Sequence, residues 1–146
     1  MPTAAKLAAA ILFAALAFAV AEIYKTTITE RTVWGYLSEV SAFMGLVWGW
    51  RVTGRLAGGG YWAAMGYGVR TMFTVFFWVI MVFAIYVMVV QSTRMRFSDP
   101  LEALLGAGSL MLDYARSILS AEVLVPAFVG GILIGLVCEF VSRRWP

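Results

Sequence analysis

Residues 71–90 read TMFTVFFWVIMVFAIYVMVV, and this stretch decides the fold of the chain. It contains no charged residue, no glycine and no proline. At a rise of about 1.5 Å per residue, it matches a hydrocarbon layer about 30 Å thick. Because lipid offers no water to backbone N–H and C=O groups, a segment that crosses it must be helical. Arg70 precedes the stretch, and Arg94 and Arg96 follow it, so we expect these charges to mark the edges of the bilayer.

The composition of the whole chain favours lipid as its surroundings. The 146 residues are 62% hydrophobic and 13% charged, and the mean hydropathy is +0.88. Soluble domains are about half apolar. We therefore predict one integral-membrane domain over residues 1–146, with the lipid bilayer as its main partner. The basic pI is explained by membrane orientation and headgroup contact, and we expect no nucleic-acid binding.

The residue types also limit the chemistry. The sequence has no histidine, which excludes a histidine-based metal site, a histidine general base and a Ser-His or Cys-His pair. The single cysteine, Cys138, excludes an intramolecular disulfide, and its neighbours favour a buried, inert thiol. We therefore expect no catalytic residue, no metal, no cofactor and no enzymatic activity.

Three further apolar segments accompany the central stretch. Together they predict an all-α membrane protein whose four transmembrane helices cover about residues 3–24, 36–54, 61–92 and 121–143. The first segment also fits a signal peptide, because Ala19-Val20-Ala21 resembles a cleavage site, but its basic region is the single Lys6. The second is short for a span, so a re-entrant segment is the alternative.

Residues 99–119 differ from the four apolar segments. Asp99, Pro100 and Glu102 form a typical helix start, with Asp at the N-cap, Pro at the first helical position and Glu two residues later. The apolar residues that follow recur at spacings of three, four and seven, and the polar residues fall on the opposite face. We predict an amphipathic helix between the third and fourth spans, lying flat on the membrane or capping the bundle.

Two glycine pairs predict close contacts between helices. Gly45 with Gly49, and Gly131 with Gly135, each form a GxxxG face. Such faces let helix backbones approach closely in lipid. The same faces could serve a homo-oligomer or a larger membrane complex.

The distribution of charge gives an orientation. Four crossings place both termini on one side, and the count of basic residues narrowly favours the cytoplasm for that side. Seven of the eight acids fall on the proposed outer side, and only Glu139 falls inside. Arg143 follows Glu139 by one helical turn, so an ordinary helix pair is expected, and a proton-coupling carboxylate is the alternative.

The turn at residues 51–60 is a candidate anion site. It reads RVTGRLAGGG, which is basic and free of acids. Successive glycines can aim backbone N–H groups at an anion, and arginines supply charge. The candidate contacts to an anion or a lipid headgroup are Arg51, Arg55, Gly58, Gly59, Gly60 and Arg70. The alternatives are a tight turn with basic anchors, and an Arg70 that extends toward headgroups at the membrane boundary.

Several short motifs, in order along the chain, carry a family resemblance. They are MPTAAKL at 1–7, GWRV at 49–52 with Gly54-Arg55, Gly60-Tyr61 with GYG at 66–68, EAL at 102–104, and RRWP at 143–146. On these motifs the chain resembles the TrgA family of small alphaproteobacterial inner-membrane proteins linked to tellurite resistance. The resemblance implies a bacterial inner-membrane location and a role in tolerating a toxic oxyanion, but no mechanism and no functional residues.

Three functions are therefore open. The first is the role that the resemblance implies, in oxyanion tolerance or membrane integrity. The second is an accessory subunit of a larger membrane complex, with the glycine pairs and the amphipathic helix as contacts. The third is a small channel or transporter, which requires an oligomer because four helices hardly enclose a path.

Overall fold

The computed structural model describes residues 4–27, 35–93 and 99–145, and the regular structure in those ranges is entirely helical. Its elements are α1 (Ala4–Thr27), α2 (Leu37–Trp48), the π-helix η1 (Gly49–Thr53), α3 (Gly54–Leu56), α4 (Tyr61–Thr93), α5 (Pro100–Ile118) and α6 (Ala121–Arg144). The predicted all-α class is confirmed. Arg94 and Arg96, with residues 1–3 and 146 of the motifs, lie outside the described residues.

Among the described residues, three helices are long and apolar enough to cross a membrane: α1, the Tyr61–Val90 part of α4, and α6. The chain therefore has the helices of a multi-pass membrane protein. The second predicted segment is divided, because α2 has only 12 residues and continues into η1 and α3. Helical backbone nevertheless runs without a break from Leu37 to Leu56. No local sequence signal predicts the π-helical turn inside it.

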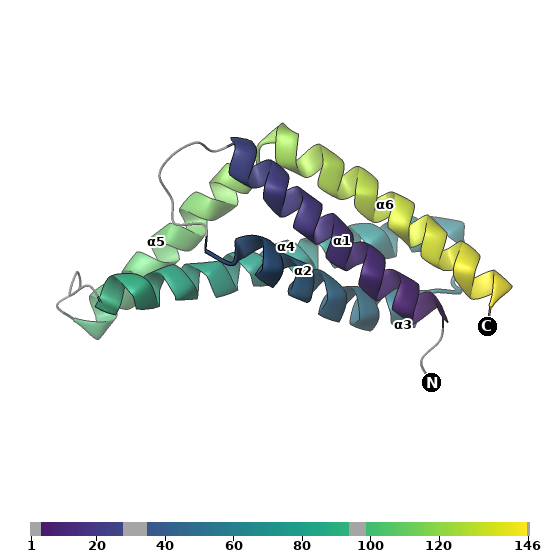
Figure 1. The fold of residues 1–146 in the computed structure, drawn as a ribbon, viewed down its shortest axis with the longest axis horizontal. Coiled ribbons are helices and arrows are strands. Elements are labelled where there is room, and N and C mark those ends of the chain that lie inside the picture. Colours follow the sequence, from purple (N-terminus) through teal and green to yellow (C-terminus); the bar gives the residue numbers. More distant parts are fainter. Residues whose placement is uncertain (1–3, 28–34, 94–98, 146) are drawn as a thin grey trace.

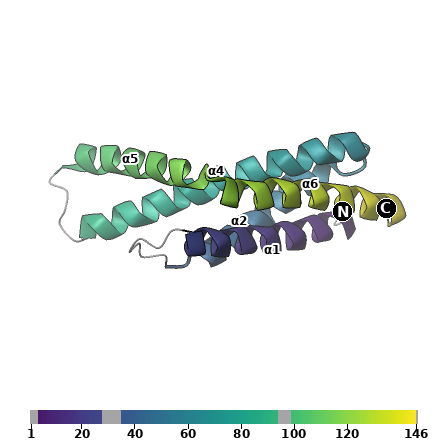
Figure 2. The same cartoon turned by 90° about the horizontal axis from the view of Figure 1, so that it is seen from above.

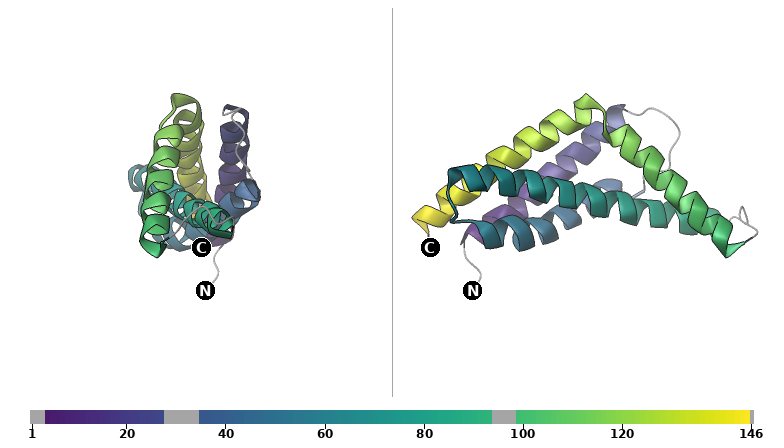
Figure 3. Two further views of the ribbon diagram at one scale, coloured as in Figure 1. Left: turned by 90° about the vertical axis from the view of Figure 1, so that its left-hand side faces the viewer. Right: turned by 180° about the vertical axis from the view of Figure 1, so that it is seen from behind.

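The other helices are arranged around α4, which is the longest helix. In the view of Figure 1, α5 and α6 meet at a short turn and form two sides of a triangle whose third side is α4. Figure 2 shows α1 and α2 on the other side of the molecule from α5, and α1 packs extensively against both α2 and α6. Both described ends of the chain lie at the same end of the molecule, together with the α3–α4 turn (Figure 3).

Glycines set the distance between α1 and the α2–η1 segment. A Cβ atom added to Gly49 would lie 2.7 Å from the carbonyl oxygen of Ala9, and one added to Gly45 would overlap the backbone of Phe13. Both glycines are buried. The two backbones therefore approach more closely than any side chain would allow.

Glycines also set the contact between α4 and α6. A Cβ atom on Gly68 would overlap the carbonyl group of Gly131, and one on Gly135 would overlap the carbonyl oxygen of Ala64. Gly131 lies near the middle of α6, so α4 crosses α6 near the midpoint of that helix. The C-terminal part of α4 continues past α6, where α5 packs against it (Figure 1).

Helix α5 packs through one face and leaves another uncovered. Tyr114 and Ile118 lie against the core. On the outer face, four leucines are between 62% and 67% exposed: Leu101, Leu104, Leu105 and Leu112. The helix begins at Pro100, as the sequence predicts, but the side chain of Asp99 makes no capping hydrogen bond.

Candidate functional site

The carboxylate of Glu139, near the end of α6, is buried against the glycine turn that joins α3 to α4. The backbone N–H of Gly58 donates to its Oε2 at 2.7 Å, and that of Gly60 donates to its Oε1 at 3.1 Å. The Nε–H of Arg143 donates to the same Oε1 at 2.9 Å. We call these four residues the glycine clamp. Three donors compensate a charge that burial would otherwise make costly.

The backbone of the turn explains why glycines stand there. Gly58 has a φ of +105° and Gly60 a φ of +104°. Residues with a side chain rarely adopt these values, and forcing one to do so costs about 1–3 kcal/mol. The two conformations turn both N–H groups toward one carboxylate. Gly59, between them, has no positive φ and makes no hydrogen bond to Glu139.

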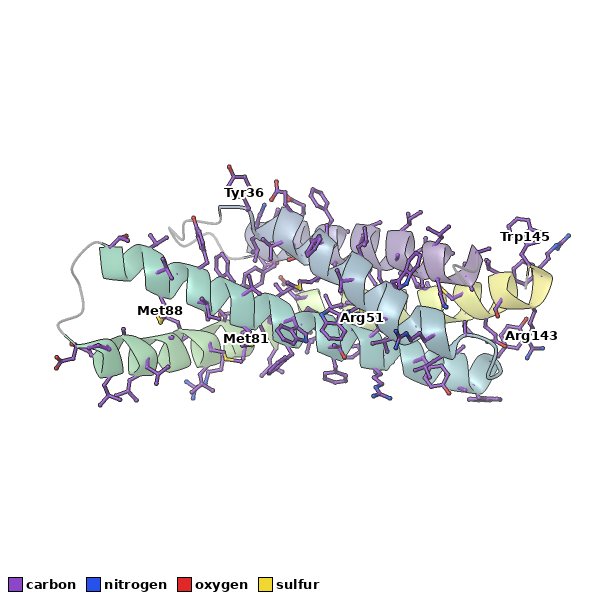
Figure 4. All side chains as sticks on the ribbon, turned by 90° about the horizontal axis from the view of Figure 1, so that it is seen from below. Tyr36, Arg51, Met81, Met88, Arg143 and Trp145 are labelled. Atoms are coloured by element: carbon purple, nitrogen blue, oxygen red, sulfur yellow. The ribbon has the colours of Figure 1, made fainter. Side chains whose placement is uncertain are left out.

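Arg143 extends the clamp to the start of α4. Its guanidinium carbon lies 4.7 Å from the centre of the Tyr61 ring, a cation–π contact. The expected pairing of Glu139 with Arg143 is present, and the Arg143 side chain is still 55% exposed. Figure 4 shows Arg143 and Trp145 together at this end of the molecule, with Met88 toward the opposite end. The clamp therefore connects the end of α6 to the glycines of the α3–α4 turn and to the start of α4.

The structure divides the predicted anion-site residues into two groups. Gly58 and Gly60 aim their N–H groups at an anion, but that anion is the chain's own Glu139. The arginines Arg51, Arg55 and Arg70 are exposed, and none of their side chains makes an ion pair or hydrogen bond with another described residue. Arg51 lies along the body of the molecule, away from the end that carries Arg143 (Figure 4).

A second polar cluster lies at the other end of α1. The carboxylate of Glu22 accepts from Lys25 Nζ at 3.0 Å and from Ser38 Oγ at 2.5 Å. The cluster joins the end of α1 to the start of α2. Sequence reasoning missed Ser38, because no local pattern links a serine to an acid 16 residues earlier.

A cavity of about 40 Å³ lies among α1, α2, α4, α5 and α6. Its lining is apolar, and small residues such as Ala17 and Ala21 leave the space open. It has room for about three water-sized groups, and an apolar lining suits hydrocarbon better than an ion. Tyr114 is in its wall, and burial raises the pKa of that phenol.

No protein-family model, no curated protein and no solved structure matches this chain. Within residues 4–27, 35–93 and 99–145, no group of three or more His, Cys, Asp or Glu side chains is placed to hold a metal ion. The TrgA resemblance therefore rests on the short motifs alone.

Several of those motif residues meet other parts of the chain. Gly49 lies against Ala9, and a Cβ atom on Gly54 would lie 2.9 Å from the Lys6 side chain. Gly60 belongs to the glycine clamp, and Tyr61 contacts Arg143. These motif residues therefore act in helix packing and in the clamp.

Proposed function

We propose that the chain is an inner-membrane protein that crosses the bilayer four times and acts in tolerance of a toxic oxyanion, the role of the TrgA family it resembles. The observation that carries membrane insertion is the exposure of large apolar side chains on every proposed span. Ile11 on α1, Phe43 on α2, Phe73 on α4 and Leu133 on α6 are each at least half exposed. Apolar surface on this scale, spread over all four segments, supports a hydrocarbon environment.

In this proposal the helical segment Leu37–Leu56 provides the second crossing, although α2 alone is short. Both termini face the cytoplasm. The clamp end of the molecule supports this orientation, because Lys6, Arg143 and Arg144 lie there. Reporter fusions after Trp145 and within the α3–α4 turn should give cytoplasmic activity, and a fusion at the α5–α6 turn should not. A cytoplasmic signal at the α5–α6 turn would overturn the orientation.

Helix α5 would lie on the outer membrane surface as an amphipathic helix. Its exposed leucines provide an apolar face. Glu102, Asp113 and Arg116 are exposed on the polar side. A helix with these two faces lies in the plane of the interface, with its leucines among the acyl chains.

The contribution to oxyanion tolerance would come from exposed cations rather than from the glycine turn. The N–H groups of Gly58 and Gly60 are already bound by Glu139, so they have no free capacity for a second anion. Arg51, Arg55 and Arg70 carry uncompensated charge on the surface. They are the residues that would meet tellurite or another oxyanion.

The test is growth of a deletion strain over a range of tellurite concentrations. Deletion should lower tolerance, and the wild-type gene should restore it. A triple Arg51→Gln, Arg55→Gln, Arg70→Gln variant should restore it poorly, whereas Arg144→Gln, which changes an exposed arginine at the end of α6, should restore it fully. Tolerance that deletion leaves unchanged at every concentration would refute the role.

The second candidate is an accessory subunit of a larger membrane complex. The observation that favours it is the uncovered leucine face of α5, which could contact another protein instead of lipid. Purification from the native membrane in a mild detergent should then recover additional chains in fixed ratio. Recovery of this chain alone would count against it.

A further inference from the structure

Arg70 lies in the part of α4 that packs against α6, and not at either end of α4. It falls within the candidate span Tyr61–Val90. Its neighbours in the sequence fix its height, because a Cβ atom on Gly131 would lie 2.6 Å from the Met72 side chain, and Gly68 touches Gly131 directly. Gly131 is about ten residues, or roughly 15 Å, from the start of α6 and somewhat farther from its end. Arg70 is therefore near the middle height of the α4–α6 pair.

The side chain of Arg70 points out of the bundle. It is exposed, and no carboxylate of the described residues pairs with it. It belongs to a regular stripe of exposed residues on α4, at spacings of three and four, formed by Trp62, Gly66, Arg70, Phe73 and Phe77. We call this the outer stripe of α4. In a membrane, the stripe faces acyl chains or another protein.

A guanidinium near the middle height of a span is costly in hydrocarbon. Such residues generally face protein or water and have a partner of opposite charge. Arginines near helix ends avoid this cost by extending to the headgroups, but Arg70 lies farther from both ends of α6 than one side chain can bridge. An anionic group at its own height would offset this cost most directly.

Gly66 leaves room for that group to approach. It is one turn before Arg70 on the same stripe, and a Cβ atom built there would meet nothing within 4 Å. In contrast, the backbone of Gly131 occupies the space beside Gly68, two residues after Gly66. An exposed glycine on a membrane helix lets a second helix pack closely, and that contact would also remove Arg70 from lipid.

A second copy of this chain does not supply the anion in a symmetric contact. Pairing two outer stripes would bring one Arg70 close to the other. Glu139 is enclosed in the glycine clamp. The other described acids lie toward the opposite end of the molecule: Glu22, Glu39, Asp99, Glu102, Asp113 and Glu122.

We propose that the outer stripe of α4 is the docking surface for a transmembrane helix of another protein, and that a carboxylate within that helix pairs with Arg70. The partner is recognised by two features, a carboxylate at mid-height in its span and a backbone that can approach Gly66. This inference rests on the membrane insertion proposed above and makes the accessory-subunit candidate specific. It shares Arg70 with the proposed oxyanion role, and an Arg70 that is paired in this way leaves Arg51 and Arg55 as the exposed cations for an oxyanion.

The test uses the full-length protein in the membrane of the cell that makes it. A photo-crosslinking amino acid replaces Phe73, which is 60% exposed on the outer stripe, or Leu133 on α6, which is 56% exposed and serves as the control position. The Phe73 position should give one discrete adduct with a different protein. The yield should fall about tenfold in Arg70→Leu, the loss expected for a membrane polar contact, and should persist in Arg70→Lys and in Arg144→Leu.

The decisive experiment is then carried out on the captured protein. Neutralising its membrane-embedded Asp or Glu should reduce the adduct as Arg70→Leu does, and exchanging the two charges between the proteins should restore it. Three results would overturn the proposal: adducts with lipid only, an adduct of two copies of this chain, or a partner adduct that Arg70→Leu leaves unchanged. Size-exclusion profiles in detergent would show that each variant is folded. Tellurite tolerance, measured on an Arg51→Gln, Arg55→Gln strain that keeps Arg70, would separate failure of the proposed role from failure of this inference.

Discussion

The side-chain oxygens of Thr53 and Thr71 lie 2.6 Å apart in the buried contact between η1 and α4. The Thr71 hydroxyl also lies 2.9 Å from the carbonyl oxygen of Tyr67, one turn earlier in α4, and donates its proton there. A hydroxyl has only one proton to donate, so Thr53 must be the donor between the two threonines. The contact is therefore directional, with Thr53 donating to Thr71 and Thr71 donating to Tyr67.

This direction predicts unequal effects of two isosteric substitutions. Thr71→Val would leave the buried Thr53 hydroxyl without an acceptor, so it should cost about 1–3 kcal/mol of unfolding free energy. Thr53→Val removes only a donor and leaves the Thr71–Tyr67 bond intact, so its cost should be nearer 0.5 kcal/mol. Unfolding in mixed micelles would measure both. Equal losses would contradict the assigned direction.

The positive φ values of the glycine turn predict a contrast among three neighbouring alanine substitutions. Gly58→Ala and Gly60→Ala should each lower stability by about 1–3 kcal/mol through backbone strain, since neither new Cβ atom meets anything closer than 3.6 Å. Gly59→Ala is the matched control. Its Cβ would make an ordinary 3.5 Å contact with Tyr67, and its φ is not positive. If Gly59→Ala lost as much stability as Gly58→Ala, steric contact and not backbone strain would account for the cost of alanine in the turn.

The glycine clamp predicts that its acid matters more than its arginine. Glu139→Ala would leave the N–H groups of Gly58 and Gly60 without their acceptor and should cost about 2 kcal/mol or more. Arg143→Ala should have a smaller effect, because that side chain is more than half exposed and the two backbone donors still hold the carboxylate. Thermal unfolding in detergent would rank the two variants. The reverse order would show that the ion pair, not the turn, fixes Glu139.

The glycines of α4 predict opposite effects two residues apart. Gly68→Ala should destabilise the purified chain strongly, because its Cβ atom would overlap the carbonyl group of Gly131. Gly66→Ala has free space and should stabilise the helix by about 0.5–1 kcal/mol. The two melting temperatures in one detergent provide the comparison. A destabilised Gly66→Ala variant would mean that the α4–α6 contact differs from the one described.

The helices themselves could be predicted from the sequence. Long apolar runs and Pro100 placed the starts of α4, α5 and α6 within one residue, because these signals are local. The π-helical turn at Gly49–Thr53 was not predicted, because it arises from packing against α1 and α4, with which it makes close contacts. The four crossings and the amphipathic character of α5 stay predictions, since they depend on a bilayer.

The candidate site could be predicted only in part. The run of glycines before Tyr61 suggested backbone N–H groups aimed at an external anion, and in the structure the N–H groups of Gly58 and Gly60 are bound by a carboxylate of the chain itself. That the anion is Glu139 depends on how α6 packs, and no pattern within the turn signals it. The height of Arg70 also depends on tertiary structure, because the Gly68–Gly131 contact sets the stagger of α4 against α6.

The glycine clamp joins parts of the chain that are 79 residues apart, and α6 is synthesised after the other described helices. Until Glu139 leaves the ribosome, the N–H groups of Gly58 and Gly60 lack their carboxylate. Helix α6 packs against both α1 and α4, so the earlier helices enter the membrane with their contact surfaces for α6 still uncovered. A nascent chain arrested before α6 would expose those surfaces to membrane chaperones and proteases, and the fold would close only once α6 has been synthesised.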